Sequence, residues 1–346
     1  MAPKLDFNGK TVFVTGGSAG LGLEISKAVA AQGAHVTIFA RRQKVLDEAR
    51  SIIKDVRRSK EQEINAVSVN LSNASEVDSA FRAQPRLPDM LFCCAGGTPG
   101  QVGFINDLTP EQLETCMQNN YLTAAFSAQM MLKIWTGDNK TAKGTTPLTR
   151  RIVFINSVAA FCTVPGMGAY SGSSNPQNCT LSSSSSRSDV SPAPKSAVRG
   201  LADCLRMEAL VYSSPTRKYS IHCAFPSTFI SDAFFEEQNG KPLLTKEIEG
   251  TVGTPEELMR KHPSAKKEAD LILAGVVKGD FAICDESIES PILFANMVGV
   301  SPRRGIGIYD TIMSLVMALA WPLIGRPWWD GLCKKYSPTW HASRKS

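Results

Sequence analysis

Residues 11–22 read Thr-Val-Phe-Val-Thr-Gly-Gly-Ser-Ala-Gly-Leu-Gly, a short apolar run followed by a glycine-rich stretch. The run Thr11–Val14 predicts a buried strand, and the periodic pattern over Leu21–Gln32 predicts a helix. Glycine tolerates positive φ and close approach of a ligand, and a helix N-terminus offers unpaired N–H groups. We therefore expect a phosphate-binding loop for a dinucleotide, a glycine-rich turn without a ligand being the alternative. The expected contacts come from Gly16, Ser18, Ala19, Gly20 and Gly22.

The rest of the chain repeats this alternation of strand and helix patterns. One helix is expected over Gln43–Ile53, and another begins at Thr109, where Pro110 suits the first turn and Gln112 can close a capping box. Each strand pattern is short and almost continuously apolar, as strands buried on both faces should be. These features predict an α/β fold, a Rossmann-type doubly wound parallel sheet with helices on both faces. The predicted strands are Thr11–Val14, His35–Ala40, Ile64–Leu71, Asp89–Cys94, Arg151–Asn156 and Ser220–Phe225.

The composition bounds the class of protein. Of the 346 residues, 43% are apolar, which excludes wholesale disorder. A net charge of +6 is mild for this length, and no basic run is interleaved with aromatics, so nucleic acid is not an expected partner. The nine cysteines and four histidines lack zinc-site spacing, so we expect buried, reduced thiols and no metal site. The first residues contain no long apolar stretch, so a cleaved signal peptide is not expected.

The end of the second predicted strand indicates which dinucleotide binds. Sites for NAD usually place an acid there for the ribose hydroxyls, but this chain reads Ala40-Arg41-Arg42. Because a guanidinium suits a 2′-phosphate, we predict that NADPH is the cofactor and that Arg41 contacts its phosphate. The alternative is that both arginines lie on a solvated loop.

Several motifs together resemble the short-chain dehydrogenase/reductase superfamily over roughly residues 8–240. They are Thr15–Gly22, Cys94-Ala95-Gly96, Asn120-Tyr121, and Ser157 followed by Tyr170. Residues 199–203 and the apolar C-terminal region make the chain most similar to the 3-ketodihydrosphingosine reductases. This resemblance implies NADPH-dependent reduction of 3-ketodihydrosphingosine, a long-chain lipid ketone, to dihydrosphingosine in sphingolipid synthesis. It also implies an enzyme at the endoplasmic reticulum membrane with its catalytic domain facing the cytosol.

Ketone reduction requires an acid and hydrogen-bond donors to the ketone oxygen. Tyr170 can supply the proton, and a nearby Lys195 ammonium would lower the pKa of the phenol from its usual value of about 10. Ser157 can donate a second hydrogen bond to the substrate, unless it is a strand-end serine bonded to a loop. The resemblance implies that Asn120 holds a water that links the lysine to solvent. The alternative is an amide that bonds a neighbouring strand.

The resemblance suggests further contacts with the cofactor. Asn70 stands where the family usually has an acid that contacts adenine, and an amide can still form a hydrogen bond there. Lys44 lies one residue out of register with a position that touches the cofactor phosphate in relatives, and a solvated lysine is the alternative. Tyr170 and Lys195 are implied to contact the cofactor, and residues 226–228 are expected to lie against the nicotinamide.

The Tyr-x-x-x-Lys spacing of the family is broken, because 24 residues separate Tyr170 from Lys195. They include a segment, 171–191, that has ten serines and hardly any apolar residues, and we predict that it is a disordered insert. Deleting 172–192 restores Tyr-x-x-x-Lys, so we hypothesise that the insert is an untranslated intervening sequence. If it is translated, it must loop out, and we then expect a weakened enzyme or a protein that only binds NADPH.

The C-terminal region carries two apolar runs, Pro291–Val300 and Ile306–Gly325, and Asp310 is the only charge in the second. The flanks of that second run are basic, and tryptophans stand where interfacial aromatics would lie. We therefore expect an NADPH-binding catalytic domain over 1–285 and a membrane-associated extension over 286–346. Residues 291–325 would form a hairpin or tilted segment embedded from the cytosolic side. A packed helix that closes the substrate pocket or makes a homo-oligomer contact is the alternative.

Two other functions stay open at this point. The same chemistry would suit a steroid or retinoid ketone, and the broken spacing would suit a non-catalytic NADPH-binding protein. The segment Phe229–Thr254, which we expect to be a mobile loop, would select the substrate, but its sequence does not identify that substrate.

Overall fold

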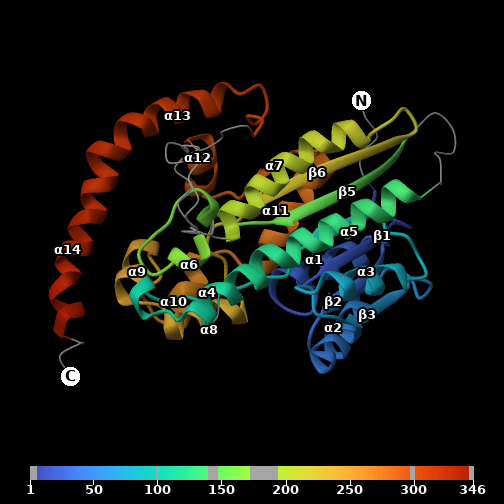
Figure 1. Cartoon of the computed structure of the whole chain (residues 1–346), viewed down its shortest axis with the longest axis horizontal. Helices are drawn as coiled ribbons and strands as arrows, with labels where there is room; N and C mark the ends of the chain where they lie inside the picture. Colours follow the sequence, from blue (N-terminus) through green and yellow to red (C-terminus); the bar gives the residue numbers. More distant parts are fainter. Residues whose placement is uncertain (1–5, 99, 139–146, 172–193, 297–300, 343–346) are drawn as a thin grey trace, which may run out of the picture.

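The computed structural model describes residues 6–98, 100–138, 147–171, 194–296 and 301–342. Within them, seven strands form one sheet in the order β3-β2-β1-β4-β5-β6-β7, and all neighbours run parallel. Helices cover both faces of this sheet (Figure 1), which confirms the predicted Rossmann-type doubly wound α/β fold. The strands are β1 Thr11–Thr15, β2 His35–Ala40, β3 Ile64–Ser68, β4 Met90–Cys93, β5 Leu148–Ile155, β6 Arg217–Phe225 and β7 Ala282–Cys284.

Neighbouring residues of each strand supply two separate cores. On one face Phe13 packs against Phe39 and Phe81 under α3, α5 and α7. On the other face Val12 and Val14 pack under α1, α2 and α11. Because both faces are covered, both sets of side chains are buried, which explains the almost continuously apolar strand patterns. These helices are α1 Gly20–Ala31, α2 Gln43–Val56, α3 Ala74–Arg82, α5 Thr123–Gly137, α7 Pro194–Tyr212 and α11 Ala265–Lys278.

The predicted elements are confirmed, with differences at their ends. Helix α4 (Pro110–Met117) begins with the expected capping box between Thr109 and Gln112. Strand β3 ends at Ser68 rather than Leu71, and β7 was not predicted because its three residues are too few to give a pattern. Three short helical turns and a small helix complete the central part: η1 Ile105–Asp107, η2 Gln118–Leu122, η3 Val158–Ala160 and α6 Gly168–Ser171.

The prediction of a mobile loop over residues 229–254 is wrong, because most of it is helical. Helix α8 (Asp232–Gly240) begins after Ser231, whose hydroxyl accepts a hydrogen bond from the N–H of Phe234. Helix α9 (Leu243–Glu249) ends at Gly250 in a left-handed conformation, and α10 (Pro255–Lys261) follows. These local caps are sufficient to stabilise short helices that have little amphipathic pattern. The predicted disordered insert covers 171–191. Ser171 is instead a buried residue of α6, and residues 172–191 lie outside the described residues.

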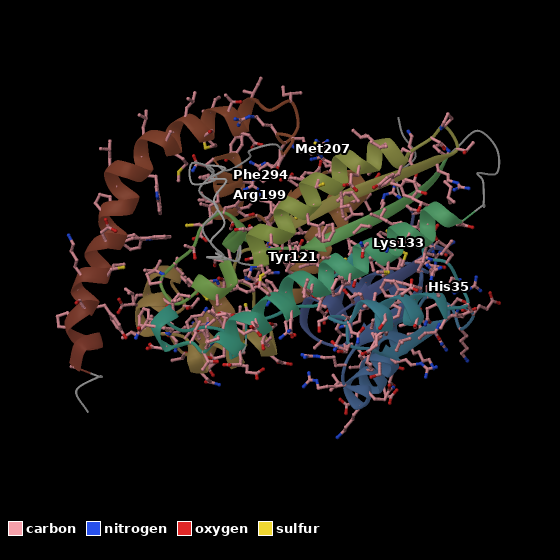
Figure 2. The ribbon with its side chains drawn as sticks, in the orientation of Figure 1. His35, Tyr121, Lys133, Arg199, Met207 and Phe294 are labelled. Atoms are coloured by element: carbon pink, nitrogen blue, oxygen red, sulfur yellow. The ribbon has the colours of Figure 1, made fainter. Side chains whose placement is uncertain are left out.

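The first apolar run of the C-terminal region packs in the catalytic core. Helix α12 (Glu289–Asn296) buries Phe294 completely, and its ring lies 5.8 Å from Phe161 and 5.7 Å from Phe225. Arg199 of α7 stacks on the same Phe161 ring, so α12 and α7 meet where Figure 2 labels Phe294 and Arg199. The prediction of an embedded hairpin is therefore wrong for residues 291–296, whose apolar side chains serve the protein core instead.

The second apolar run leaves the body of the protein as a long helical arc (Figure 1). It comprises α13 (Ile308–Ala320), η5 (Trp321–Gly325) and α14 (Arg326–Ala342). The arc returns to the catalytic domain where α14 packs near α9 and the ring of Tyr336 lies 6.0 Å from that of Phe104. By length and composition alone, the continuous helix over residues 308–339 could cross a membrane, and only 6% of its most apolar window is buried.

Candidate active site

The loop between β1 and α1 is so tight that only glycine fits at several positions. Gly16 has a φ of +68°, and a Cβ on it would lie 2.8 Å from the Cα of Ala95. A Cβ on Gly22 would lie 2.3 Å from the carbonyl oxygen of Gly16. Ala95 follows β4, so the loop lies at the point where the sheet order switches between β1 and β4. Doubly wound sheets bind nucleotides at this switch point.

The N-terminus of α1 is suited to an anion. Ala19 is its N-cap, and neither a capping side chain nor a first-turn acid competes for its N–H groups within the described residues. The 12-residue helix adds the positive end of its dipole. The predicted loop residues, Gly16, Ser18, Ala19, Gly20 and Gly22, therefore stand in one cradle whose shape and donors fit the pyrophosphate of a dinucleotide.

The residues after β2 and β3 occupy the expected position for the adenosine end of that dinucleotide. Arg41 and Arg42 follow β2 directly and are exposed, and Lys44 is exposed in the first turn of α2. The side-chain oxygen of Asn70 accepts hydrogen bonds from the N–H and hydroxyl of Ser72. Because this oxygen is already bonded, Asn70 has only its NH₂ group to offer a ligand. The first turn of α2 contains no acid, so no carboxylate there pairs with Arg41, Arg42 or Lys44.

The structure brings Tyr170 and Lys195 together across the residues that separate them in sequence. Tyr170 lies in α6 and Lys195 in the first turn of α7, and the ammonium lies 5.4 Å from the centre of the phenol ring. The hydroxyl of Ser196 donates to the carbonyl of Ser171 at 2.9 Å. The two ends that flank residues 172–193 thus meet, and α6 and α7 place the pair as one continuous helix would.

Lys195 is buried and held in place. Its ammonium donates to the carbonyl of Ile155 at the end of β5, and Asn156 donates from its side chain to the carbonyl of Lys195. Burial lowers the pKa of Lys195 to about 8, while the nearby thiols of Cys223 and Cys116 oppose that shift. A lysine with this pKa is mostly charged at neutral pH and can stabilise a negative charge beside it.

Tyr170 is a phenol that keeps its proton in the absence of a reaction. Burial raises its pKa well above the ordinary value, and the charges of Glu237 and Glu249 raise it further. The prediction that Lys195 lowers this pKa is therefore wrong, because burial has the larger effect. A protonated phenol next to an ammonium is a poor base but a positioned acid, because any negative charge that forms on its oxygen meets the cation of Lys195. The pair can therefore deliver a proton to a basic oxygen.

Ser157 lies two residues after the end of β5 and is the N-cap of η3. Its hydroxyl oxygen accepts a hydrogen bond from the N–H of Ala159 at 3.2 Å, as the loop alternative proposed. Because the hydroxyl accepts in this bond, its O–H group can still donate to a second partner. The hydrogen bond from Ala159 thus positions the Ser157 side chain and leaves the O–H group available. The N–H of Ser157 in turn donates to the side chain of Asn156, which ties Ser157 to the residue that holds Lys195.

Asn120 lies in the π-helical turn η2 and is 2% exposed. Its side-chain oxygen accepts from the N–H of Gly97, and its NH₂ group donates to Gly97, Gln101 and Cys116. All of its hydrogen-bonding atoms are thus occupied by protein, which matches the alternative of a structural amide more closely than the water-holding role. Asn120 instead fixes the loop after β4, and π-helical turns are frequent at functional sites.

A buried ion cluster near Tyr170 escaped the sequence analysis. On α8, Glu237 pairs with Lys241, and Lys241 also binds Glu249 of α9 at 2.6 Å. Thr98 donates its hydroxyl to Glu237 from the loop that Asn120 holds. The Glu-x-x-x-Lys spacing of residues 237 and 241 was a signal for an ion pair. It gave no sign of burial or of the third member, because both depend on how α8 and α9 pack.

Comparisons with known proteins agree with this geometry. Residues 10–175 match the short chain dehydrogenase family. The chain is 30% identical over 327 residues to a 3-ketodihydrosphingosine reductase of Aspergillus fumigatus, covering 90% of this chain and 80% of that protein. It is 29% identical to a PIGF/3-ketodihydrosphingosine reductase fusion protein of Schizosaccharomyces pombe, spanning 95% of this chain but 57% of the fusion protein.

Solved structures share the fold. A short chain dehydrogenase/reductase of Burkholderia phymatum in complex with NAD superimposes with a TM-score of 0.62 at 17% identity, covering 85% of this chain and 93% of the other. A short-chain dehydrogenase of Sphingobium yanoikuyae in complex with NADPH gives a TM-score of 0.59 at 17% identity, covering 90% and 94%.

Proposed function

This chain belongs to the 3-ketodihydrosphingosine reductases of the short-chain dehydrogenase family, and we propose that it reduces 3-ketodihydrosphingosine to dihydrosphingosine with NADPH. The chain is an oxidoreductase by that membership. The observation that supports the specific reaction is the meeting of Tyr170 and Lys195, with Ser157 tied through Asn156 to the backbone of Lys195. An acid, a cation and a second donor at one place are what a ketone oxygen requires during reduction.

NADPH, when bound, supplies the hydride for the carbonyl carbon. The hydroxyl of Ser157 donates a hydrogen bond to the carbonyl oxygen and holds it at the phenol of Tyr170. As negative charge develops on that oxygen, Tyr170 transfers its proton to it. The ammonium of Lys195 then stabilises the phenolate, and its hydrogen bond to the carbonyl of Ile155 restricts its position. Asn120 contributes by fixing the loop of Gly97 and Thr98 at the edge of the site.

The preference for NADPH over NADH rests on the residues after β2. Arg41 and Arg42 stand where sites for NAD place an acid, and Lys44 adds a third exposed cation. A planar guanidinium binds a phosphate through two parallel hydrogen bonds, whereas it gains little from a ribose hydroxyl. Arg41 would thus hold the 2′-phosphate, with Lys44 as a weaker contributor, and the NH₂ group of Asn70 could donate a hydrogen bond to adenine.

The helical arc after residue 305 binds the membrane of the endoplasmic reticulum, with the catalytic domain on the cytosolic side. Its apolar side chains are exposed to an extent that water does not favour: Leu315 is 64% exposed and Leu319 is 70% exposed. Asp310, the one acid among residues 306–325, is fully buried and bound by Arg304, so its charge is compensated inside the protein. Arg303 and the lysines 334 and 335 flank the apolar stretch with positive charge.

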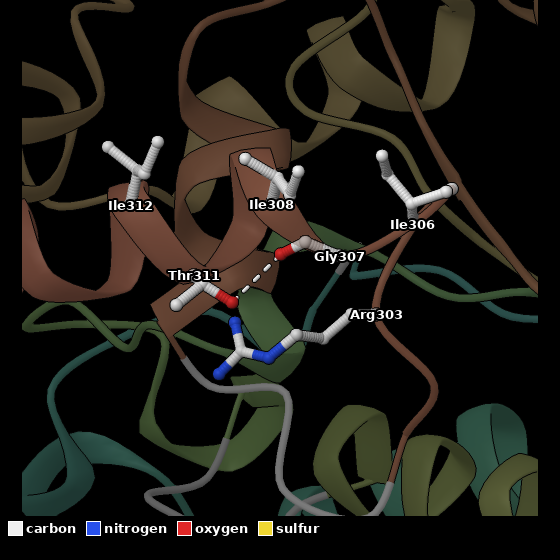
Figure 3. Close-up of a pocket in the computed structure, with 7 residues that line it drawn as sticks. Arg303, Ile306, Gly307, Ile308, Thr311 and Ile312 are labelled. Carbon is white, nitrogen blue, oxygen red and sulfur yellow. Dashed lines mark hydrogen bonds between the residues drawn. The ribbon is translucent and has the colours of Figure 1, made fainter.

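A hollow at the base of the arc fits this placement. It has a volume of about 460 Å³, lies at the start of α13 and combines one guanidinium with isoleucine side chains (Figure 3). Arg303 and Thr311 lie at its polar side, and Ile306, Ile308 and Ile312 point the other way. A surface with a cation beside exposed aliphatic side chains suits the boundary between lipid headgroups and acyl chains. Membrane contact would also bring the long alkyl chain of the substrate to the enzyme.

The proposed reaction is tested by incubating the full chain with NADPH and 3-ketodihydrosphingosine in detergent or vesicles and by identifying the product by mass spectrometry. We expect dihydrosphingosine with NADPH and a lower kcat/KM with NADH. Arg41→Ala should narrow that difference between the two cofactors by about tenfold. Reduction of steroid or retinoid ketones in preference to 3-ketodihydrosphingosine would replace the proposed substrate while leaving the chemistry intact.

A further inference from the structure

The ion cluster on α8 and α9 holds more negative than positive charge. Lys241 is the only cation that its two carboxylate partners bind within the described residues, and its side chain is 3% exposed. The side chains of Glu237 and Glu249 are 13% and 20% exposed, so all three groups are largely removed from water. Two carboxylates and one ammonium leave one negative charge without a partner of opposite sign. A buried charge of this kind is unfavourable unless a ligand compensates it.

The cluster is bonded to the loop after β4, which Asn120 fixes. Asn120 binds both backbone groups of Gly97, the next residue, Thr98, donates to Glu237, and Glu237 pairs with Lys241. The charges of Glu237 and Glu249 also raise the pKa of Tyr170, which means that both carboxylates lie within electrostatic reach of the phenol. The surplus charge therefore lies beside the place where a ketone oxygen is protonated.

Two uncharged groups next to the cluster also lack partners. Thr251, two residues after Glu249, is 2% exposed, and its hydroxyl has no hydrogen-bond partner among the residues that the structure describes. The same holds for both polar atoms of the buried carboxamide of Gln238, which follows Glu237 on α8. Buried polar atoms are seldom left unsatisfied in folded proteins, and a polar ligand at this place would satisfy them.

We propose that Glu237 and Glu249, bridged by Lys241, bind the ammonium group of an α-amino ketone substrate and so place its carbonyl at Tyr170. The inference rests on the proposed function, because 3-ketodihydrosphingosine carries its amino group on the carbon next to the ketone. When the carbonyl of this substrate lies at the phenol of Tyr170, its ammonium must also lie close to that phenol. From there the ammonium can compensate the surplus negative charge of the cluster.

Binding of the ammonium would also prepare the acid. Burial first, and then the two carboxylates, raise the pKa of Tyr170, and a bound cation would offset the part that the carboxylates contribute. An amino ketone would then find a phenol that releases its proton more easily than it does for a plain ketone. The cluster would thus select the substrate through both affinity and rate.

The test compares two ketones of equal chain length, 3-ketodihydrosphingosine and the 1-hydroxy-3-ketone that lacks the amine. We expect the wild-type protein to prefer the amine by at least about tenfold in kcat/KM, the value of one charge-assisted hydrogen bond. Glu249→Gln should abolish most of this preference, because it should lower the kcat/KM of the amino ketone far more than that of the plain ketone. The control, Glu247→Gln, alters an exposed residue of the same helix and should change neither value.

The variant should fold, because Glu249→Gln leaves Lys241 paired with Glu237. Glu237→Gln is the second variant and should give the same loss of preference. A third measurement needs no variant: N-acetylation removes the positive charge of the substrate and should lower its kcat/KM at least about tenfold. Equal losses on both ketones in Glu249→Gln, or a wild-type protein without preference for the amine, would overturn the inference. Failure to reduce either ketone would overturn the proposed function as well.

Discussion

At the scale of single residues, the account depends on two buried groups whose burial opposes the charge that each must carry. Burial keeps Tyr170 protonated and makes Lys195 less basic than a lysine in water. When the two groups lie together, each reduces the free-energy cost of the charge on the other, because a phenolate and an ammonium have opposite charges. The same pairing fixes the direction in which activity must change with pH.

Reduction should weaken as the pH rises through about 8. Burial lowers the pKa of Lys195 from 10.5 to about 8, so the ammonium that stabilises the phenolate is lost above that pH. Lys195→Arg keeps its charge and should move the decline in kcat/KM to higher pH, at lower absolute activity. A kcat/KM that stays flat up to pH 10 in the wild type would contradict this assignment.

The effect of the same lysine on stability has the opposite sign. The unfolded chain keeps the proton on Lys195 up to about pH 10.5, whereas the folded protein releases it near 8. Between these two values the unfolded state binds more protons, so the contribution of Lys195 to the free energy of unfolding increases with pH. Urea unfolding of wild type and Lys195→Met at pH 7.5 and 9.5 measures this contribution. The stability advantage of the methionine variant should shrink at the higher pH, and an advantage that grows would contradict the burial of the ammonium.

Gly22→Ala should disrupt the nucleotide cradle. Its Cβ would lie 2.3 Å from the carbonyl oxygen of Gly16, so the loop must shift. Overpacking of this kind costs about 1–3 kcal/mol, and we expect NADPH affinity to fall at least about tenfold. Gly137→Ala is the matched control, because a Cβ there meets nothing within 4 Å. Fluorescence titration with NADPH compares the two, and equal affinities would argue against a cofactor at this loop.

At the scale of elements, the catalytic helix is assembled from two pieces. The bond between Ser196 and Ser171 shows that α6 and α7 meet where an uninterrupted Tyr-x-x-x-Lys helix would continue. The sequence alone could predict the residues but not this meeting, because spacing along the chain says nothing about two ends brought together by packing. The helices α8 and α9 escaped prediction for a related reason, since short capped helices carry little periodicity.

Deleting residues 172–192 should therefore leave an active and more stable protein. Closing 24 residues costs on the order of 3 kcal/mol in loop entropy, and the deletion removes most of that cost. We expect a higher Tm and a kcat/KM at or above that of the full chain. Loss of activity would show that the inserted residues contribute to the site. Sequencing of the mature transcript tests separately whether they are translated.

At the scale of the whole molecule, the catalytic domain and the apolar arc are joined through α12. Phe294 anchors α12 between Phe161, which follows the Ser157 turn, and Phe225, which precedes the expected nicotinamide loop. The hydroxyl of Ser301 donates to Asp203 of the catalytic helix at 2.6 Å. The sequence predicted an apolar extension but did not show that residues 291–296 belong to the protein core. An apolar run has the same sequence pattern whether it is buried in a protein or in a membrane.

Charged substitutions in the arc should release the protein from membranes. Leu315→Asp with Leu319→Asp alters exposed residues and should not affect folding, whereas an acid at the centre of an embedded helix costs about 2.5–3.5 kcal/mol. We expect sedimentation with phospholipid vesicles to fall at least about tenfold. Val211→Asp, at a residue 80% exposed on α7, should leave sedimentation unchanged. Vesicle binding that survives the double substitution would favour the packed or oligomeric role of the arc.

The central claim is that Tyr170 and Lys195 act together as the proton-donating pair of a ketone reductase. Its most direct test follows NADPH oxidation with 3-ketodihydrosphingosine in wild type and Tyr170→Phe, with NADPH affinity measured in parallel. The account predicts a loss of about 10²- to 10⁴-fold in kcat in Tyr170→Phe, with NADPH affinity nearly unchanged. A variant that oxidises NADPH with this ketone as fast as wild type does would contradict it.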